Sequence, residues 1–138
     1  MTQQKQSVDL AISKTDRLQY LLFLPRDYGK NAKDRWPLIF FFHGRGERGD
    51  DLEMVKKFGL PQRLETWPQC PFVVVSPQCP ADSYWTFKLD SLDALLDHAS
   101  QPEVGWGLPF IIDANYLLSS RMRVAAQHPH FRRGLNGW

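Results

Sequence analysis

The sequence of 138 residues has little of several features that mark particular classes of protein. Seventeen Lys and Arg stand against 15 Asp and Glu, so the formal net charge is only +2 and does not favour nucleic acid as a partner. The two cysteines, Cys70 and Cys79, have no CxxC or metal-ligand spacing. We interpret them as reduced structural thiols, and we expect no metal and no cofactor.

Long apolar runs and targeting signals are absent as well. The stretch 108–118 is interrupted by Asp113 and Asn115, and no window reaches the ~18 apolar residues that a membrane span needs. Residues 1–10 are polar and lack the apolar centre of a signal peptide. We therefore expect a cytoplasmic protein with no membrane partner. Hydrophobic residues at 43% and charged residues at 23% are typical of one folded domain.

Apolar runs alternate with helical patterns over the first hundred residues. Three runs predict strands, of which the last two are apolar throughout and typical of strands buried on both faces: Leu18–Leu24, Leu38–His43 and Phe72–Val75. Three segments predict helices, the first capped by Asp50 and Asp51 and ended by Gly59: Asp50–Phe58, Leu60–Trp67 and Leu89–Ala99. The alternation predicts an α/β fold, with a mainly parallel sheet and flanking helices.

The composition changes near Ser100. Beyond it there is no lysine, and the only acids are Glu103 and Asp113. We expect residues 1–100 to be the N-terminal part of the domain and residues 101–138 to be a divergent tail. Within that tail, Pro109 and a broad apolar stripe predict a helix through about Gln127.

The most informative segment is His43–Gly49, which reads HGRGERG between a buried strand and a helix. Ligands of open parallel sheets bind beyond the carboxyl ends of the strands, where glycines let backbone N–H groups approach an anion or a developing oxyanion. The segment is not GxGxxG in register and lacks the GK[ST] of a P-loop. A nucleotide site is therefore not favoured.

Three segments together resemble the N-terminal half of bacterial α/β-hydrolase esterases, the serine hydrolases related to dienelactone hydrolase, feruloyl esterase and the phospholipase/carboxylesterase group. They read LQYLLFLPRDYG, WPLIFFFHGRGERGDDLEMVKKFGLP and PFVVVSPQCPADSYW, and the resemblance covers roughly residues 18–99. It implies a truncated α/β-hydrolase fold and, as the activity of the family, hydrolysis of a small-molecule carboxylic ester. It also implies that the backbone N–H of Arg45 is an oxyanion-hole donor, that Gly44 and Gly46 shape its turn, and that Gln78 and Trp85 line the acyl side.

The catalytic half of such an enzyme is not recognisable. The family needs a G-x-S-x-G nucleophile elbow, followed in chain order by an acid and a His, yet none of the nine glycines belongs to one. Ser119 and Ser120 have no glycine beside them, and neither His128 nor His130 has the preceding strands that the family uses. The nucleophile, acid and base are thus not identified, and the tail is interpreted as an out-of-frame or otherwise replaced segment.

Three functions remain open: an ester hydrolase that is inactive or incomplete as this chain, a noncatalytic small-molecule-binding module, and half of a split hydrolase completed by a complementary C-terminal segment. Self-association is expected through the apolar sheet edge after the third buried strand.

Individual residues also keep plain structural interpretations. His43 ends a buried strand, so a hydrogen-bonded structural role is favoured over a general base. The charged residues Glu47, Arg48, Asp50 and Asp51 are interpreted as solvated caps rather than cation ligands. Trp85 either lines the acyl side or covers the end of the sheet.

Overall fold

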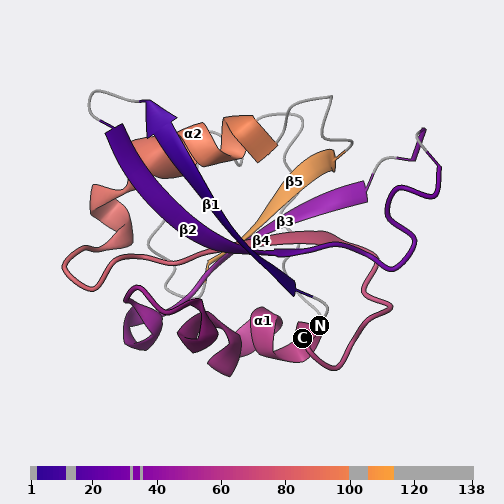
Figure 1. Ribbon diagram of the computed structural model, residues 1–138, viewed down its shortest axis with the longest axis horizontal. Coiled ribbons are helices and arrows are strands. Elements are labelled where there is room, and N and C mark those ends of the chain that lie inside the picture. The colour runs from indigo at the N-terminus through magenta and orange to yellow at the C-terminus, as the bar shows by residue number, and fades with distance from the viewer. Residues whose placement is uncertain (1–2, 12–14, 32, 35, 100–105, 114–138) are drawn as a thin grey trace.

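The computed structural model describes residues 3–11, 15–31, 33–34, 36–99 and 106–113, with residues 10–11 and 106–113 described by their backbone alone. Five strands form one sheet (Figure 1): β1 (Gln3–Ala11), β2 (Thr15–Phe23), β3 (Trp36–Phe42), β4 (Val73–Pro77) and β5 (Trp106–Asp113). The helices are α1 (Gly59–Leu64) and α2 (Leu89–Ala99), with short 3-10 helices η1 (Arg45–Glu47), η2 (Leu52–Lys57) and η3 (Trp85–Phe87). No helix in these ranges is long and apolar enough to cross a membrane.

The sheet is mixed rather than mainly parallel. Its strand order is β1-β2-β4-β3-β5, in which β1–β2 and β2–β4 are antiparallel while β4–β3 and β3–β5 are parallel. The expected parallel sheet is therefore found only on the side that carries the two fully apolar strands. The carboxyl ends of β3 and β4 lie side by side there, which places the segments after Phe42 and Pro77 next to each other.

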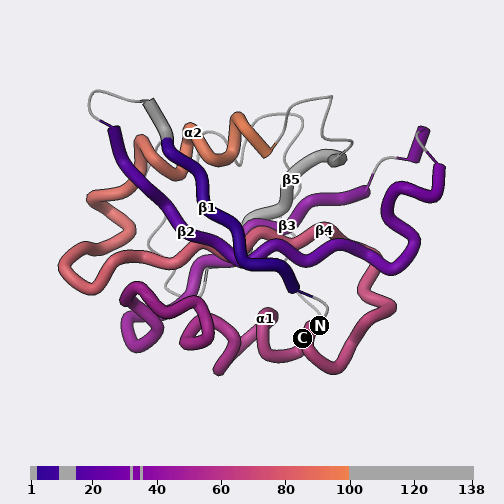
Figure 2. Tube along the Cα trace, in the orientation of Figure 1, coloured from indigo at the N-terminus to yellow at the C-terminus, as the bar shows by residue number. Residues whose placement is uncertain are grey.

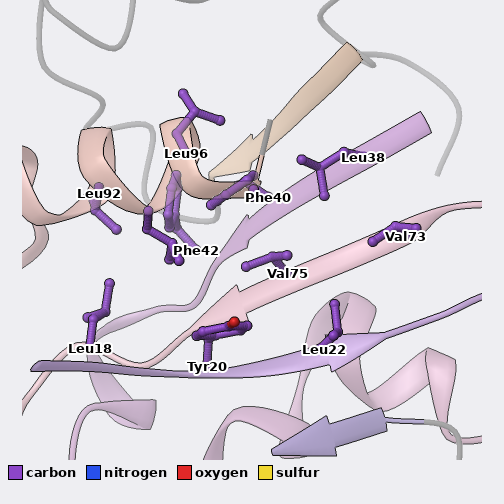
Figure 3. Packing of buried hydrophobic residues seen from close by; sticks show 12 residues of the cluster. Leu18, Tyr20, Leu22, Leu38, Phe40, Phe42, Val73, Val75, Leu92 and Leu96 are labelled. Carbon is purple, nitrogen blue, oxygen red and sulfur yellow. The ribbon is translucent and has the colours of Figure 1, made fainter. Parts of the chain in front are cut away.

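Helices cover both faces of the sheet, with α2 on one side and α1 with η2 on the other (Figure 1). The Cα trace in Figure 2 shows the central strands running between these two layers. On the α2 side, alternate residues of β2, β3 and β4 pack against the apolar stripe of the helix (Figure 3). Among them, Phe40, Phe42 and Leu92 are at most 1% exposed. The amphipathic helix predicted at Leu89–Ala99 is confirmed with the same bounds.

The opposite face packs on α1 and η2, with Ile39, Phe41 and Leu64 buried together. The chain reaches α1 through Gly59, whose φ of +66° is the left-handed conformation that glycine adopts without strain. A Cβ built at Gly59 would lie 2.7 Å from Cζ of Phe41, so the sheet and this turn are in close approach. The segment before it is a six-residue 3-10 helix rather than the expected longer helix, although Asp51 caps it as predicted by accepting from the Glu53 N–H at 3.0 Å.

Strand β2 is tied to the start of α2 by a polar contact inside the apolar layer. Lys88 Nζ lies 3.0 Å from Asp16 Oδ2, and the Ser91 hydroxyl donates to the same oxygen. Ser91 is only 2% exposed, and the side chains of Asp16 and Lys88 are 16% and 17% exposed. Because Asp16 binds both residues, it fixes where α2 begins above the sheet.

Residues 106–113 form a strand, so the helix predicted through 109–127 is wrong at residues 109–113. β5 pairs in parallel with β3, from Trp36–Trp106 to Phe42–Asp113, with an irregularity beside the Leu38–Pro109 pair. Proline is tolerated at an edge strand or a bulge because its missing N–H can face away from the ladder. The apolar strand after which we expected an open edge, β4, is paired on both sides, with β2 and with β3. Residues 114–127 lie outside the described residues, and the boundary near residue 100 stays a prediction.

Candidate functional site

The HGRGERG segment forms a tight turn at the carboxyl end of β3. Gly44 is extended, with φ −77° and ψ −178°, and precedes η1, in which the Glu47 N–H donates to the Gly44 carbonyl at 3.4 Å. The amides at the start of a helix have no acceptor within it, and those of Arg45 and Gly46 occupy that position. A Cβ at Gly46 would meet nothing within 4 Å, and the Arg45 side chain is exposed. The position that a side chain of residue 46 would take is therefore open.

The imidazole of His43 holds this turn through two hydrogen bonds. Its Nε2 accepts the backbone N–H of Cys79 at 3.0 Å, and its Nδ1 lies 2.6 Å from the Gly44 carbonyl oxygen. Because Nε2 accepts, the ring must be neutral with its proton on Nδ1, which donates to Gly44. Burial, with 1% of the residue exposed, lowers the pKa of His43 below its ordinary value. Both ring nitrogens are thus engaged in the structure, which supports the structural interpretation over a general base.

Gln78 joins the segment after β4 to the loop after β3. Its side-chain Nε2 donates to the Glu47 and Asp51 carbonyls at 2.9 Å each, and its backbone N–H donates to the Gln19 carbonyl at 2.8 Å. Two carbonyl acceptors fix the orientation of the amide, since an oxygen in that place would face other oxygens. Gln78 is 3% exposed, and its Oε1 has no hydrogen-bond partner among the described residues. The resemblance placed Gln78 on the acyl side; the contacts show it holding the loop.

Trp85 closes the same corner. Its indole Nε1–H donates to the His43 carbonyl at 3.0 Å, and its ring centroid lies 5.0 Å from that of His43 and 5.3 Å from that of Phe42. Trp85 is half-buried. The contacts fit the interpretation of a tryptophan that covers the end of the sheet.

Arg48 is the residue that sequence reasoning missed, because it was interpreted as a solvated charge. Its Nε–H donates to the Arg45 carbonyl at 3.2 Å, and its Nη1–H donates to the Ser83 carbonyl at 2.9 Å. The guanidinium carbon also lies 4.5 Å from the centre of the Tyr84 ring, within the range of a cation–π contact. One side chain therefore connects the loop after β3 with the loop after β4. The sequence held two signals for this contact: an Arg in a glycine-rich loop, and the aromatic pair Tyr84 and Trp85 after the next buried strand.

Gly49 has a backbone conformation that would be strained for a residue with a side chain. Its φ is +150°, and its N–H donates to the Cys79 carbonyl at 2.9 Å. A hollow of about 170 Å³ lies next to it, lined by Arg17, Gln19, Gly49, Asp50, Gln78 and Pro80. Gln78 lines this hollow and also bonds to the Glu47 carbonyl, at the last residue of η1.

The part of the chain that the structure describes holds no group of three His, Cys, Asp or Glu side chains arranged for a metal ion. Cys70 and Cys79 are free and buried, and burial raises the pKa of both thiols. They are therefore poor nucleophiles and poor ligands at neutral pH. Ser119, Ser120, His128 and His130 all lie outside the described residues.

The arrangement brings the five expected site residues to one corner, at the carboxyl ends of β3 and β4. Gly44, Arg45 and Gly46 form the turn. Gln78 donates to the carbonyl of Glu47, which follows the turn, and Trp85 donates to the carbonyl of His43, which precedes it. Chemically, this corner offers backbone donors and a rigid frame. Among the described residues, the one buried imidazole is occupied by two hydrogen bonds and is therefore not free to act as a base.

Among solved structures, the chain is similar to a thermostable esterase, at 22% identity and a TM-score of 0.57 over 81% of this chain and 34% of that one. It is also similar to a ferulic acid esterase, at 13% identity and a TM-score of 0.48 over 80% and 51% of the two chains. A third is a hypothetical protein from Pseudomonas aeruginosa, at 17% identity and a TM-score of 0.48 over 79% and 35%. No protein-family model and no curated protein matches the sequence.

The likeness to the thermostable esterase shows that the fold is α/β-hydrolase-like. The chain spans about a third of the length of that esterase.

Proposed function

We propose that this chain carries the oxyanion-hole side of a serine-type carboxylic ester hydrolase, with the backbone N–H of Arg45 as one donor. The observation that supports this is the place of Arg45: it is the first residue of η1, directly beyond the carboxyl end of β3. An amide there has no helical acceptor and points to where a ligand of an open sheet binds.

Such a donor would act on the charge that develops during acyl transfer. When an ester carbonyl is attacked, its oxygen becomes an oxyanion, and a donor already in place stabilises that oxygen without reorganising. Three contacts hold the Arg45 peptide still: the Arg48 bond to its carbonyl, the His43 bond to the Gly44 carbonyl, and the Gln78 bond to the Glu47 carbonyl.

The proposal assigns no nucleophile, acid or base to residues of this chain, because the sequence contains no G-x-S-x-G. Trp85 would border the acyl group with the part of its ring that stays exposed. Gln78 would act indirectly, by fixing the loop rather than by touching substrate.

A noncatalytic small-molecule-binding module is the second candidate. The same missing elbow supports it, because a rigid set of donors without a nucleophile binds an anionic or carbonyl ligand and does not turn it over. The two candidates agree on the loop and differ on whether any ester is cleaved.

The loop is tested with a stable mimic of the tetrahedral intermediate, p-nitrophenyl methylphosphonate, titrated into the ¹⁵N-labelled chain while the backbone amides are followed by NMR. We expect saturable shifts at Arg45 and Gly46. Arg45→Pro removes the donor while keeping the turn, since proline suits the first helical position and Gly44 is already extended as a residue before proline must be. We expect about a tenfold or greater loss of affinity.

Arg45→Ala is the matched control, because it removes the guanidinium and keeps the amide. Equal binding by Arg45→Ala and the unsubstituted chain supports a backbone donor. An equal loss in Arg45→Ala and Arg45→Pro would show that the side chain binds the phosphonate, and shifts confined to other loops would remove the proposal.

A further inference from the structure

Strand β1 forms one edge of the sheet, and its only described neighbour is β2 (Figure 1). The apolar strand β4, at whose edge we expected self-association, is paired with β2 and β3 on its two sides, so that reason does not apply there. β1 is different: nine residues long, regularly paired along its whole length with β2, and free of proline and glycine. Alternate residues of such a strand direct N–H and C=O groups away from the sheet, as a template for another strand.

The side chains along β1 make this edge polar on one face. Lys5, Ser7 and Asp9 alternate and are exposed, while Gln6 and Val8 between them are half-buried towards the other face. Lys5 lies 2.8 Å from Glu53, but both side chains are 52% exposed, so the ammonium remains accessible to a further carboxylate.

A second copy of the chain can pair with this edge in antiparallel fashion about a two-fold axis normal to the sheet. Pairing of all nine residues on both strands requires Gln3 opposite Ala11 and Ser7 opposite its own counterpart, because Ser7 is the middle residue of β1. Every shifted register leaves residues of both strands unpaired. Backbone hydrogen bonding therefore favours the register centred on Ser7.

The charges select the same register independently. With Ser7 at the centre, Lys5 of each copy lies opposite Asp9 of the other, which gives two equivalent pairs of opposite charge. Registers centred on residue 5 or residue 9 would place like charges opposite each other. Registers centred on residue 6 or residue 8 would pair each of these charges with an uncharged residue. Asp9 also lies opposite Arg17 within its own sheet, so charges alternate across the seam.

We propose that β1 is a self-complementary edge through which two copies of this chain pair antiparallel, joining their five-stranded sheets into one. The occupant of the edge is a second copy of the chain, because a strand with the β1 sequence satisfies full pairing and charge complementarity at the same register. The seam lies at the edge remote from β3 and β5, and it uses none of the residues of the glycine turn.

The test is a charge exchange followed by sedimentation velocity of the full chain. Asp9→Lys places Lys opposite Lys, and Lys5→Asp places Asp opposite Asp, so each variant alone should dimerise about tenfold or more weakly than the unsubstituted chain. Mixed in equal amounts, the two variants present opposite charges again. We expect the mixture to form heterodimers with an affinity close to that of the unsubstituted dimer.

Recovery of dimerisation when the two variants are mixed could not be produced by misfolded proteins. Lys57→Glu, a charge reversal at an exposed residue of η2, is the matched control and should leave dimerisation unchanged. A monomeric unsubstituted chain at concentrations up to ~200 μM would overturn the proposal. A dimer that neither variant weakens, or a mixture that is no tighter than its components, would overturn it as well.

Discussion

The backbone N–H of Cys79 donates a hydrogen bond of 3.0 Å to Nε2 of His43, so the loop after β4 is joined to the residue that directly follows β3. Protonation of that nitrogen would remove the acceptor. The neutral ring is therefore part of the frame that positions the glycine turn.

His43 makes stability depend on pH. Burial lowers its pKa in the folded chain below the ordinary 6.5, so the unfolded chain binds the proton first as the pH falls. The free energy of unfolding should be constant above about pH 7 and should decrease as the pH falls below 6.5 towards the lowered pKa. Urea unfolding across this range measures it. In His43→Gln the slope between about pH 6.5 and pH 5 should flatten; an unchanged slope would place the titrating group elsewhere.

Asp16 predicts a second, more acidic transition. Burial raises its pKa, but hydrogen bonds from Ser91 and Lys88 outweigh burial and hold the pKa below the ordinary 3.8. The stability that Asp16 contributes is therefore present above 3.8 and is lost as the pH falls below it. Asp16→Asn should cost about 1 to 3 kcal/mol at neutral pH in urea unfolding, and less in acid.

Asp27 is the matched control for Asp16. It pairs with Lys30 on the surface, with side chains 59% and 70% exposed, so Asp27→Asn should leave the unfolding midpoint at neutral pH unchanged. Equal effects of the two substitutions would mean that the contact between β2 and α2 carries no special weight.

Two glycines should respond oppositely to alanine. Gly59→Ala meets both a left-handed φ of +66° and the Phe41 ring 2.7 Å from the new Cβ, and should lower the free energy of unfolding by about 2 kcal/mol or more. Gly46→Ala meets nothing within 4 Å and should change it by less than about 0.5 kcal/mol. Thermal or urea unfolding of the two variants decides the matter, and similar losses would contradict the described turn geometry.

The chain should not react as a serine hydrolase by itself. A fluorophosphonate probe needs a serine activated by a His and held at an elbow, and the sequence has no G-x-S-x-G. We expect no labelling above a heat-treated sample and no hydrolysis of p-nitrophenyl esters. Labelling that mass spectrometry places on Ser119 or Ser120 would show that the tail builds a nucleophile of another kind.

Apolar runs and amphipathic spacing were sufficient to predict β2, β3, β4 and α2, because those elements bury what their sequences make apolar. β1 was not predicted, since its side chains are largely polar and its stability comes from backbone pairing with β2. Residues 109–113 of β5 were predicted as part of a helix because Phe110 and Ile111 fit a helical stripe as well as a strand. Pairing with β3, which decides between them, is a long-range contact that local spacing does not contain.

At the site, glycine spacing predicted the position of the turn but not what holds it. The contacts of Arg48, Gln78 and His43 join residues 31 to 36 positions apart, or pass through backbone carbonyls that have no signature in a sequence. Gln78 in particular was expected to line the acyl side, and the bonds of its amide nitrogen to two carbonyls of the loop could not be predicted from the sequence.

The strand order β1-β2-β4-β3-β5 also has a consequence for how the chain acquires its structure. β1 and β2 are joined by a short connection and can pair as a local hairpin, but β2 and β3, which are consecutive in the chain, never pair with each other. They remain apart until β4 inserts between them, with Leu22 meeting Val75 and Phe40 meeting the same residue from the other side. Closing such long loops costs chain entropy before the contacts between strands stabilise them, and this makes folding slow. Because β4 is the strand that joins β2 to β3, the parallel side of the sheet and the corner with the glycine turn depend on its insertion.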